Sequence, residues 1–178
     1  ADHLAALAGP PGARLRLDAN NLWNDPAAAA AHLAQLACVA PYFAVEEPLK
    51  VECGAALPVL ARELDVAIVL DESLTRVAQL AALDPGVRWI ANLRVSKLGG
   101  LLRSLELLAA CRARGVGVVV GAQVGETSLL TRVGLVLAHA AGDALVAQEG
   151  GFGTLLLASD PCTPLLQFGA RGELDFAA

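Results

Sequence analysis

The stretch Tyr42-Phe-Ala-Val-Glu46-Glu-Pro48 joins an apolar run to a carboxylate, and the same pattern occurs at two other places in the chain. The other two apolar runs end at Asp18, in Arg-Leu-Arg-Leu-Asp-Ala-Asn, and at Asp71, in Ala-Ile-Val-Leu-Asp-Glu-Ser. The spacing is nearly even and corresponds to one strand, one helix and two short connections, which is the length of a repeating βα unit. If the strands are parallel neighbours, the three carboxylates converge at one rim. Such oxygen ligands suit Mg²⁺, which proteins hold through a few carboxylates together with water and substrate oxygens.

Three more apolar runs continue this rhythm and predict strands within residues 86–98, 115–124 and 144–148. They lack clean alternation of apolar and polar residues, which favours a parallel sheet covered by helices. One helix is expected after Asn24 or Asp25, with Pro26 at its first position. Further helices are expected at 54–64, 74–83, 100–114 and 127–141, and the segment after Gly151 is expected to be irregular or briefly helical. We therefore predict an α/β fold of about six βα units.

The composition indicates a folded domain with a sizeable core. The chain has 178 residues, of which 56% are hydrophobic and 17% charged, so burial is favoured over disorder. The net charge of −5 gives no electrostatic reason to expect nucleic acid or an anionic membrane surface as a partner. The sequence shows no span of about 18 uninterrupted apolar residues, and Ala1 onward lacks a basic region followed by an apolar core, so we expect neither a membrane span nor a signal peptide. Its 4 scattered cysteines favour buried thiols in a reducing cytoplasm.

Six βα units are most of a (β/α)₈ (TIM) barrel but not all of it, because a complete barrel needs about 250 residues. Six parallel strands do not close easily, and their two open edges favour pairing with another chain. The chain also begins with Ala1. We expect residues 1–178 to form a single, partial barrel domain. It would belong to a longer protein, or be completed by a partner segment or by homo-oligomerisation.

In this order and at these spacings, the motifs resemble the C-terminal barrel of the enolase superfamily, in its mandelate racemase and muconate lactonizing enzyme branch, from the third barrel strand onward. The motifs that carry the resemblance are Asp18-Ala-Asn20, Glu46-Glu47-Pro48, Asp71-Glu72-Ser73, Arg94-Val-Ser-Lys97-Leu-Gly99-Gly100 and Val120-Gly-Ala-Gln-Val-Gly-Glu126-Thr127, at the third to seventh strands. The resemblance covers residues 14–170. It implies that an N-terminal capping domain and the first two barrel strands are missing from this chain.

The resemblance implies an isomerase or lyase that removes the proton next to the carboxylate of a small substrate. Mg²⁺, with Mn²⁺ as an alternative, would stabilise the resulting enediolate, and Asp18, Glu46 and Asp71 would hold the metal. Such a proton is very weakly acidic, and a divalent cation near the intermediate's oxygens lowers the barrier by neutralising charge. The outcome stays open between racemisation, epimerisation, cycloisomerisation and dehydration, because the branch shares only the first step.

Two departures from the family pattern concern the acid/base groups. The branch carries a Lys-x-Lys pair at its second barrel strand, which would precede Ala1, so the isolated fragment is expected to be inactive. The catalytic Lys of the sixth strand aligns with Arg94. Arg stays protonated, so it suits a substrate carboxylate or a structural ion pair better than proton abstraction. Lys97 aligns with a second Lys of that motif, but it lies on the opposite face from Arg94 unless the strand ends early.

Neighbouring polar residues have both functional and structural interpretations. Asn20 either supports the metal site or makes an Asx turn. Glu47 and Glu72 are expected to form hydrogen bonds to lysines or waters around the ligands. Glu126, beside the candidate N-cap Thr127, is either catalytic or stabilises the dipole at a helix start.

Two rival hypotheses stand beside the metal-dependent enzyme. A non-catalytic fragment or degenerate paralogue would keep the barrel packing, with or without the metal site; it is motivated by Arg94 and by the missing lysines. An unrelated βα-barrel piece would bind a phosphorylated ligand through the amides of Gly99-Gly100, although a tight turn explains these glycines as well. That hypothesis predicts metal binding that does not depend on Asp18 or Asp71.

Overall fold

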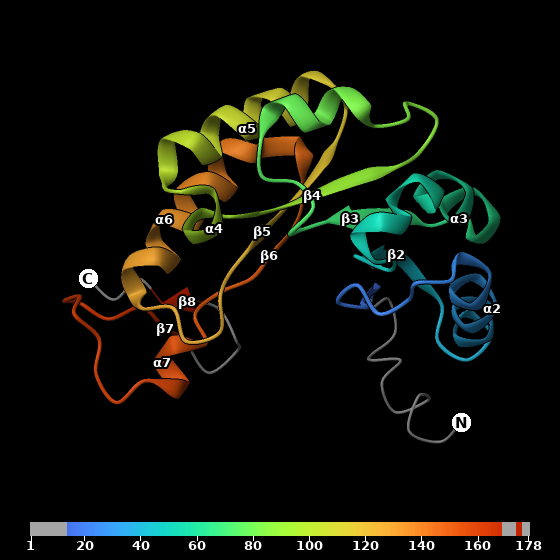
Figure 1. Ribbon diagram of the computed structural model, residues 1–178. Helices are drawn as coiled ribbons and strands as arrows, with labels where there is room; N and C mark the ends of the chain where they lie inside the picture. The colour runs from blue at the N-terminus through green and yellow to red at the C-terminus, as the bar shows by residue number, and fades with distance from the viewer. Residues whose placement is uncertain (1–13, 169–173, 176–178) are drawn as a thin grey trace. The chain divides into compact units, whose positions relative to one another are not determined.

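The computed structural model describes residues 14–168 and 174–175 (Figure 1). The chain divides into two compact units. The first unit extends to Leu74 and includes Ala81–Ile90, and the second contains Thr75–Leu80 and the residues from Ala91 onward.

Strands and helices alternate along the chain. The strands of the main sheet are β1 (Leu15–Asp18), β2 (Tyr42–Glu46), β3 (Ala67–Leu70), β4 (Trp89–Arg94), β5 (Gly117–Gly121) and β6 (Leu145–Gln148). The α-helices are α2 (Pro26–Ala37), α3 (Leu57–Leu64), α4 (Val95–Leu98), α5 (Leu101–Ala113), α6 (Ser128–Ala141) and α7 (Gly153–Leu156). The remaining elements are the 3₁₀ helices η1 (Val51–Ala56), η2 (Val77–Ala82) and η3 (Gly142–Ala144) and the short antiparallel strands β7 (Gln167–Phe168) and β8 (Leu174–Asp175).

The six-stranded sheet has the order β1-β2-β3-β4-β5-β6, so each strand lies next to its neighbour in sequence. The pairs β1–β2, β2–β3 and β5–β6 are parallel. The strands of a (β/α)₈ barrel follow the same sequential order, with eight strands where this sheet has six. This order confirms the predicted α/β fold of incomplete (β/α)₈ type.

The core of the first unit forms around β2 and β3. Val45, Ile68 and Val69 are fully buried, as expected for strands that are apolar on both faces. Helices α2 and α3 pack against each other (Figure 1) and contribute Leu33 and Leu60 to the core. Burying one such side chain stabilises the fold by about 1.5–3 kcal/mol.

Helix α2 begins as the sequence predicts, and the structure selects one of the two candidate caps. Asp25 is the N-cap residue, and its Oδ1 accepts a hydrogen bond from the amide of Ala27 at 2.9 Å. Pro26 follows at the first helical position, where its missing N–H costs nothing.

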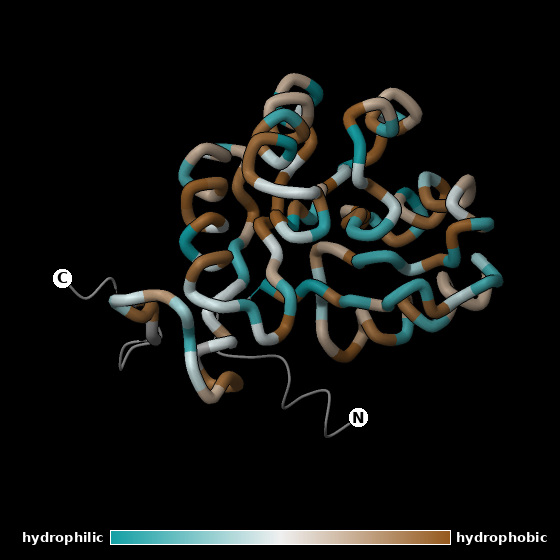
Figure 2. Tube along the Cα trace, turned by 60° about the vertical axis from the view of Figure 1, so that its left-hand side comes forward, coloured by the Kyte–Doolittle hydropathy of each residue, from teal (hydrophilic) through white to brown (hydrophobic). Residues whose placement is uncertain are grey.

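The second unit has its own core, built on β5 and on the helices α5 and α6, which pack against each other (Figure 1). Val118, Val119, Leu107 and Leu137 are almost fully buried there. Burial raises the pKa of the Cys111 thiol to about 11, so this side chain stays protonated and packs as an apolar group. Brown and teal residues alternate along the helical turns in Figure 2, which is typical of helices with one buried face. In the described part of the chain, no helix is long and apolar enough to cross a membrane.

The expected helix at 74–83 is wrong, because that segment contains only the 3₁₀ helix η2. The side-chain Oε1 of Gln79 accepts hydrogen bonds from the amides of Thr75 and Arg76, at 2.9 and 2.8 Å. Such side-chain contacts satisfy backbone donors locally and compete with α-helical hydrogen bonds. The expected helix at 54–64 likewise starts as the 3₁₀ helix η1 and becomes α-helical only at Leu57.

The segment after α7 is tied to the start of α6 by Asp160. Its Oδ2 accepts from the amide of Ser128 at 2.6 Å, and its Oδ1 accepts from the amide of Cys162 at 2.9 Å. Thr127 is the N-cap residue, as predicted, but its side chain makes no capping hydrogen bond. Desolvation alone would raise the pKa of Asp160, but the hydrogen bonds from the two amides outweigh it, so this pKa lies below its ordinary value.

We expect Asp160→Asn to lower the free energy of unfolding at pH 7. A carboxylate whose pKa is depressed in the folded state stabilises the protein above the pKa of the unfolded chain, about 3.9. This contribution disappears as the pH falls through the folded pKa, so the difference between parent and variant should shrink progressively as the pH falls below about 3.9. Urea unfolding of both proteins across this range measures the difference, with Asp143→Asn at an exposed site as the control. A difference that stays constant with pH would contradict the assignment.

Candidate functional site

The three candidate metal ligands lie at the ends of three neighbouring strands of the first unit. Asp18, the last residue of β1, is the register partner of Glu46, the last residue of β2. Glu46 in turn is the partner of Val69 in β3. Partners in a parallel ladder point to the same face, so the side chains of Asp18 and Glu46 share one face of the sheet.

Asp71 continues the phase of Val69, two residues earlier. The carbonyl oxygen of Val69 accepts a hydrogen bond from the amide of Glu47 at 3.1 Å, and the amide of Asp71 also points to Glu47, where it donates to Oε1 at 2.7 Å. Both groups thus face β2, as alternate residues of one strand do. Asp71 itself lies one residue beyond the end of β3, and continuation of the strand's alternation would place its side chain on the face shared by Asp18 and Glu46.

Burial differs among the three carboxylates. Glu46 and Asp71 are only 3% and 5% exposed, whereas Asp18 is exposed to solvent. Two buried carboxylates near one another need compensation by positive charge or by hydrogen bonds. Arg16, two residues before Asp18 and hence on the same face, supplies some of it, because its Nε lies 3.5 Å from Glu46 Oε2.

The donor set fits Mg²⁺ in chemical type, because all three groups are hard carboxylate oxygens at strand ends that share a face. The side chains are not gathered around one point, however. Within residues 14–168 and 174–175, no three His, Cys, Asp or Glu side chains lie close enough together to form a metal-binding group. Their convergence on one cation is therefore a proposal, supported by strand register and residue type.

The loop after β1 has an unusual backbone. Asn20 and Asn21 both have left-handed conformations, with φ of 47° and 55°, which Asn tolerates better than most residues. Asp18 Oδ1 accepts a hydrogen bond from the amide of Asn20 at 3.0 Å, so the Asx turn is made by Asp18. The side chain of Asn20 is exposed, as is Glu72 beside Asp71, and support of the metal ligands by these two residues remains a prediction.

The candidate acid/base residues belong to the second unit. Strand β4 ends at Arg94 and helix α4 begins at Val95, so Lys97 does not lie on the strand. The early strand end that a role for Lys97 requires is therefore present. Lys97 Nζ turns back to donate to the carbonyl oxygen of Asn92 at 2.8 Å. The catalytic roles of Arg94 and Lys97 stay predictions.

Glu126 connects the loop after β5 to helix α4. Its Oε1 accepts hydrogen bonds from the amide of Gln123 at 2.9 Å and from the hydroxyl of Ser96 at 3.1 Å. The backbone carbonyl of Glu126 is also close to Gly153, where an added Cβ would lie 1.8 Å from its oxygen. Glu126 thus has a structural role in this loop, and its catalytic role stays a prediction.

Gly99 and Gly100 form the turn between α4 and α5. Both have positive φ, 83° and 113°, and the carbonyl of Gly100 accepts from the amide and the hydroxyl of Ser104 at 3.2 and 2.9 Å. This geometry supports the tight-turn interpretation of the pair.

Gly121, at the end of β5, leaves room for two side chains of β4. A Cβ at this position would lie 2.0 Å from Asn92 Oδ1 and 2.9 Å from Arg94 Cγ. The absence of a side chain at Gly121 therefore leaves the space that the side chains of Asn92 and Arg94 occupy beside the end of β5.

Sequence reasoning missed several polar residues near the strand ends. Arg16 could have been found from its position two residues before Asp18, and Ser73 from its place in the turn after β3. Glu149 follows β6 as the other acids follow their strands, and its amide donates to the carbonyl of Val120 at 2.8 Å. The strand-end rule that selected Asp18, Glu46 and Asp71 also applies to Glu149.

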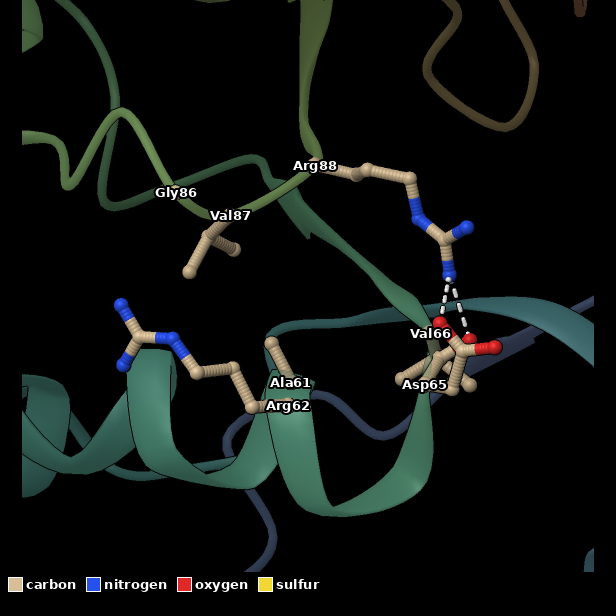
Figure 3. Close-up of a pocket in the computed structure, with 7 residues that line it drawn as sticks. All are labelled: Ala61, Arg62, Asp65, Val66, Gly86, Val87 and Arg88. Carbon is tan, nitrogen blue, oxygen red and sulfur yellow. Dashed lines mark hydrogen bonds and ion pairs between the residues drawn. The ribbon is translucent and has the colours of Figure 1, made fainter.

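A cavity of about 260 Å³ lies in the first unit, at the beginnings of the strands. It is lined by Ala61, Arg62, Asp65, Val66, Gly86, Val87 and Arg88 (Figure 3). Arg88 is bonded to Asp65 at 2.9 Å and Arg62 is paired with Asp84, and Figure 3 shows the two guanidinium groups pointing in different directions. These side chains form ion pairs near the beginnings of β3 and β4, and their guanidinium groups do not converge on one point. In barrels of this type, chemistry is concentrated at the carboxyl ends of the strands.

The chain belongs to the enolase C-terminal domain-like family, whose sequence model matches residues 2–167. This confirms the resemblance to the mandelate racemase and muconate lactonizing enzyme branch of the enolase superfamily. Among its curated relatives is the hydrophobic dipeptide epimerase of Roseobacter litoralis, which is 30% identical over 125 residues, or 69% of this chain and 35% of that protein.

Solved structures of the same family have the same fold. A dipeptide epimerase from Enterococcus faecalis, complexed with Mg and the dipeptide L-Leu-L-Tyr, aligns with a TM-score of 0.79 and 25% identity over 94% of this chain and 47% of that chain. A 2-chloromuconate cycloisomerase from Rhodococcus opacus aligns with a TM-score of 0.77 and 28% identity over 93% of this chain and 44% of that chain. The chain thus spans about a third of the length of the curated relatives and less than half of these solved chains.

The packing around Gly121 generates a stability prediction. Gly121→Ala should lower the free energy of unfolding by about 1–3 kcal/mol, because its Cβ would collide with the buried side chain of Asn92. Gly134→Ala in α6 is the matched control: its Cβ would meet Val120 Cγ1 at an ordinary 3.7 Å, so this change should be neutral or stabilising. Denaturant unfolding of both variants is the measurement. Equal stability of the two would show that Asn92 and Arg94 do not depend on Gly121.

Proposed function

We propose that the full-length protein is a Mg²⁺-dependent isomerase that removes the proton α to the carboxylate of a small substrate. The observation that carries this proposal is the register of Asp18 with Glu46 at the ends of β1 and β2, with Asp71 directly after the end of the neighbouring strand β3. Three carboxylates in this arrangement would offer a divalent cation several negatively charged oxygen ligands. Mg²⁺, or Mn²⁺ in its place, would supply positive charge next to the oxygens of the substrate carboxylate.

In this proposal the chain's own residues divide the work. Asp18, Glu46 and Asp71 hold the cation, and Arg16 limits the repulsion between the buried carboxylates through its contact with Glu46. Arg94, at the end of β4, binds a carboxylate group of the substrate, because a guanidinium matches the two oxygens and stays charged. Lys97 is the acid/base candidate within this chain, and any partner base belongs to segments outside it.

Among the possible reactions we favour epimerisation, with a dipeptide as the substrate, because the named relatives include dipeptide epimerases. Cycloisomerisation is the second member of the same reaction class, since cycloisomerases align with the chain equally well. We also propose that the open sheet edges are completed by further segments of the protein or by a second copy. The four free cysteines support a reducing compartment such as the cytoplasm.

A second candidate is a non-catalytic relative that keeps the metal ligands. It is favoured by one observation, the presence of Arg94 where the family pattern has a catalytic Lys. Arg cannot accept a proton at physiological pH, so catalysis would depend on Lys97 or on groups outside this chain. The two candidates differ in α-proton exchange but not in metal binding.

The metal assignment predicts that Asp71→Asn weakens Mg²⁺ binding at least about tenfold, since it removes one ligand charge. The fold should survive, because Asp71 joins the turn through its backbone amide, which the substitution retains. Isothermal titration calorimetry with Mg²⁺ on the full-length protein measures the affinity, and Asp143→Asn at an exposed site is the control. Unchanged affinity in Asp71→Asn would contradict the proposed metal site.

The acid/base assignment predicts that Lys97→Arg abolishes exchange of the substrate α-proton for deuterium in D₂O. Arg preserves the positive charge and can still donate to the carbonyl of Asn92, but it cannot act as a base. Mass spectrometry of hydrophobic dipeptides incubated with Mg²⁺ and the full-length protein measures this exchange. Exchange retained at the parent rate would show that Lys97 is not the base for these substrates. No exchange in the parent protein, with Mg²⁺ binding intact, would favour the non-catalytic candidate.

A further inference from the structure

Glu47 touches each of the three segments that carry the candidate ligands. Its amide donates to the carbonyl of Val69 in β3 at 3.1 Å, and its own carbonyl accepts from the amide of Asn21, in the loop after β1, at 2.7 Å. It follows Glu46 directly in the chain. One residue therefore has backbone contacts to the strands or loops of Asp18, Glu46 and Asp71.

The side chain of Glu47 adds a third link. Its Oε1 accepts hydrogen bonds from the amide of Asp71 at 2.7 Å, from the amide of Ser73 at 2.9 Å and from the hydroxyl of Ser73 at 2.6 Å. The residue is only 3% exposed. A buried carboxylate is stable when its charge is met by hydrogen bonds, and bonds to a charged acceptor are stronger than neutral ones.

The backbone of Glu47 shows that this arrangement is imposed on the residue. Its φ is 38°, in the left-handed region that non-glycine residues seldom adopt. Conformations of this kind persist where surrounding contacts determine them, and they occur most often near functional sites. The strand ends at Glu46, and Glu47 in its left-handed conformation directs its carboxylate to the amides of Asp71 and Ser73.

We propose that Glu47 is a positioning residue that fixes the backbone of Asp71 relative to Glu46 and to the loop of Asp18. It contacts neither metal nor substrate in this role. By holding the amide of Asp71, it sets the direction in which the Asp71 side chain points. We call the hydrogen bonds of Glu47 Oε1 to Asp71 and Ser73 the Glu47 clamp. The hydrogen bonds themselves are observed in the structure. The inference that they position a ligand of a divalent cation rests on the proposed function.

The residue type matters for a physical reason. One oxygen of a carboxylate can accept several donors at once, and its negative charge strengthens each bond. A Gln side chain keeps the length but loses the charge, and its NH₂ group adds donors where the turn already presents donors. Residues that orient metal ligands in this way typically change metal affinity by about 10- to 100-fold when they are replaced.

The test compares four variants of the full-length protein with the parent. Glu47→Gln removes the charge, Ser73→Ala removes one of the three bonds, and Ser73→Thr retains the hydroxyl as a rescue. Glu63→Gln, an exposed acid on α3, is the control for loss of a negative charge. Two measurements are made on each protein: amide hydrogen exchange at Asp71 and Ser73 without metal, and the Mg²⁺ dissociation constant by calorimetry.

We expect Glu47→Gln to accelerate exchange of the Asp71 and Ser73 amides and to raise the Mg²⁺ dissociation constant at least about tenfold. Ser73→Ala should have a smaller effect in the same direction, while Ser73→Thr and Glu63→Gln should match the parent. A purely structural role would lower the melting temperature without changing the Mg²⁺ affinity of the folded protein, and that result would overturn the inference.

The outcomes also separate this inference from the proposed function. If the parent binds Mg²⁺ through Asp71 and Glu47→Gln binds it equally tightly, the positioning role is wrong and the proposed function stands. If the parent binds no Mg²⁺, the proposed function is wrong, and the positioning of metal ligands by Glu47 is wrong with it. Amide exchange in the metal-free variants then still decides whether the clamp itself exists.

Discussion

The register of β1, β2 and β3 is the constraint on which the candidate site depends. Asp18 is paired with Glu46, and Glu46 with Val69, so a slip of one residue in either pairing would turn a carboxylate to the opposite face. The same slip would expose apolar residues that are now fully buried, such as Val45 and Ile68. Core packing and the common orientation of the carboxylates are therefore maintained by the same interactions.

Much of the sheet could be predicted because its strands are near-continuous apolar runs, and such runs are distinctive in a chain of this length. The strand ends followed from the same runs, and with them the positions of Asp18, Glu46 and Asp71. The 3₁₀ segment η2 could not be predicted in this way, because it depends on which backbone amides donate hydrogen bonds to the side chain of Gln79. The capping of α6 by Asp160 joins residues far apart in sequence, and no local pattern marks such a contact.

The candidate site shows the same limit. Residue type and spacing identified the carboxylates, but the hydrogen bonds of Glu47 depend on a left-handed turn that Glu seldom adopts. The turn of Lys97 toward Asn92 likewise depends on α4 beginning directly after Arg94, which is a question of one or two residues at a strand end. In both cases the residue was recognised as a candidate, and its partner was decided by backbone geometry.

The division of the chain into two units has a consequence for how the protein can change over time. The three carboxylates and the Glu47 clamp all lie before Thr75, whereas Arg94, Lys97 and Glu126 lie after Ile90. The hydrogen bonds of Glu47 to Asp71 and Ser73 lie within the first unit, and those of Lys97 to Asn92 and of Glu126 to Gln123 and Ser96 lie within the second. A substitution at the proton-transfer candidates can therefore leave the hydrogen bonds of Glu47 intact, and descendants of a common ancestor could retain the proposed cation ligands while acquiring a different proton-transfer residue, or none.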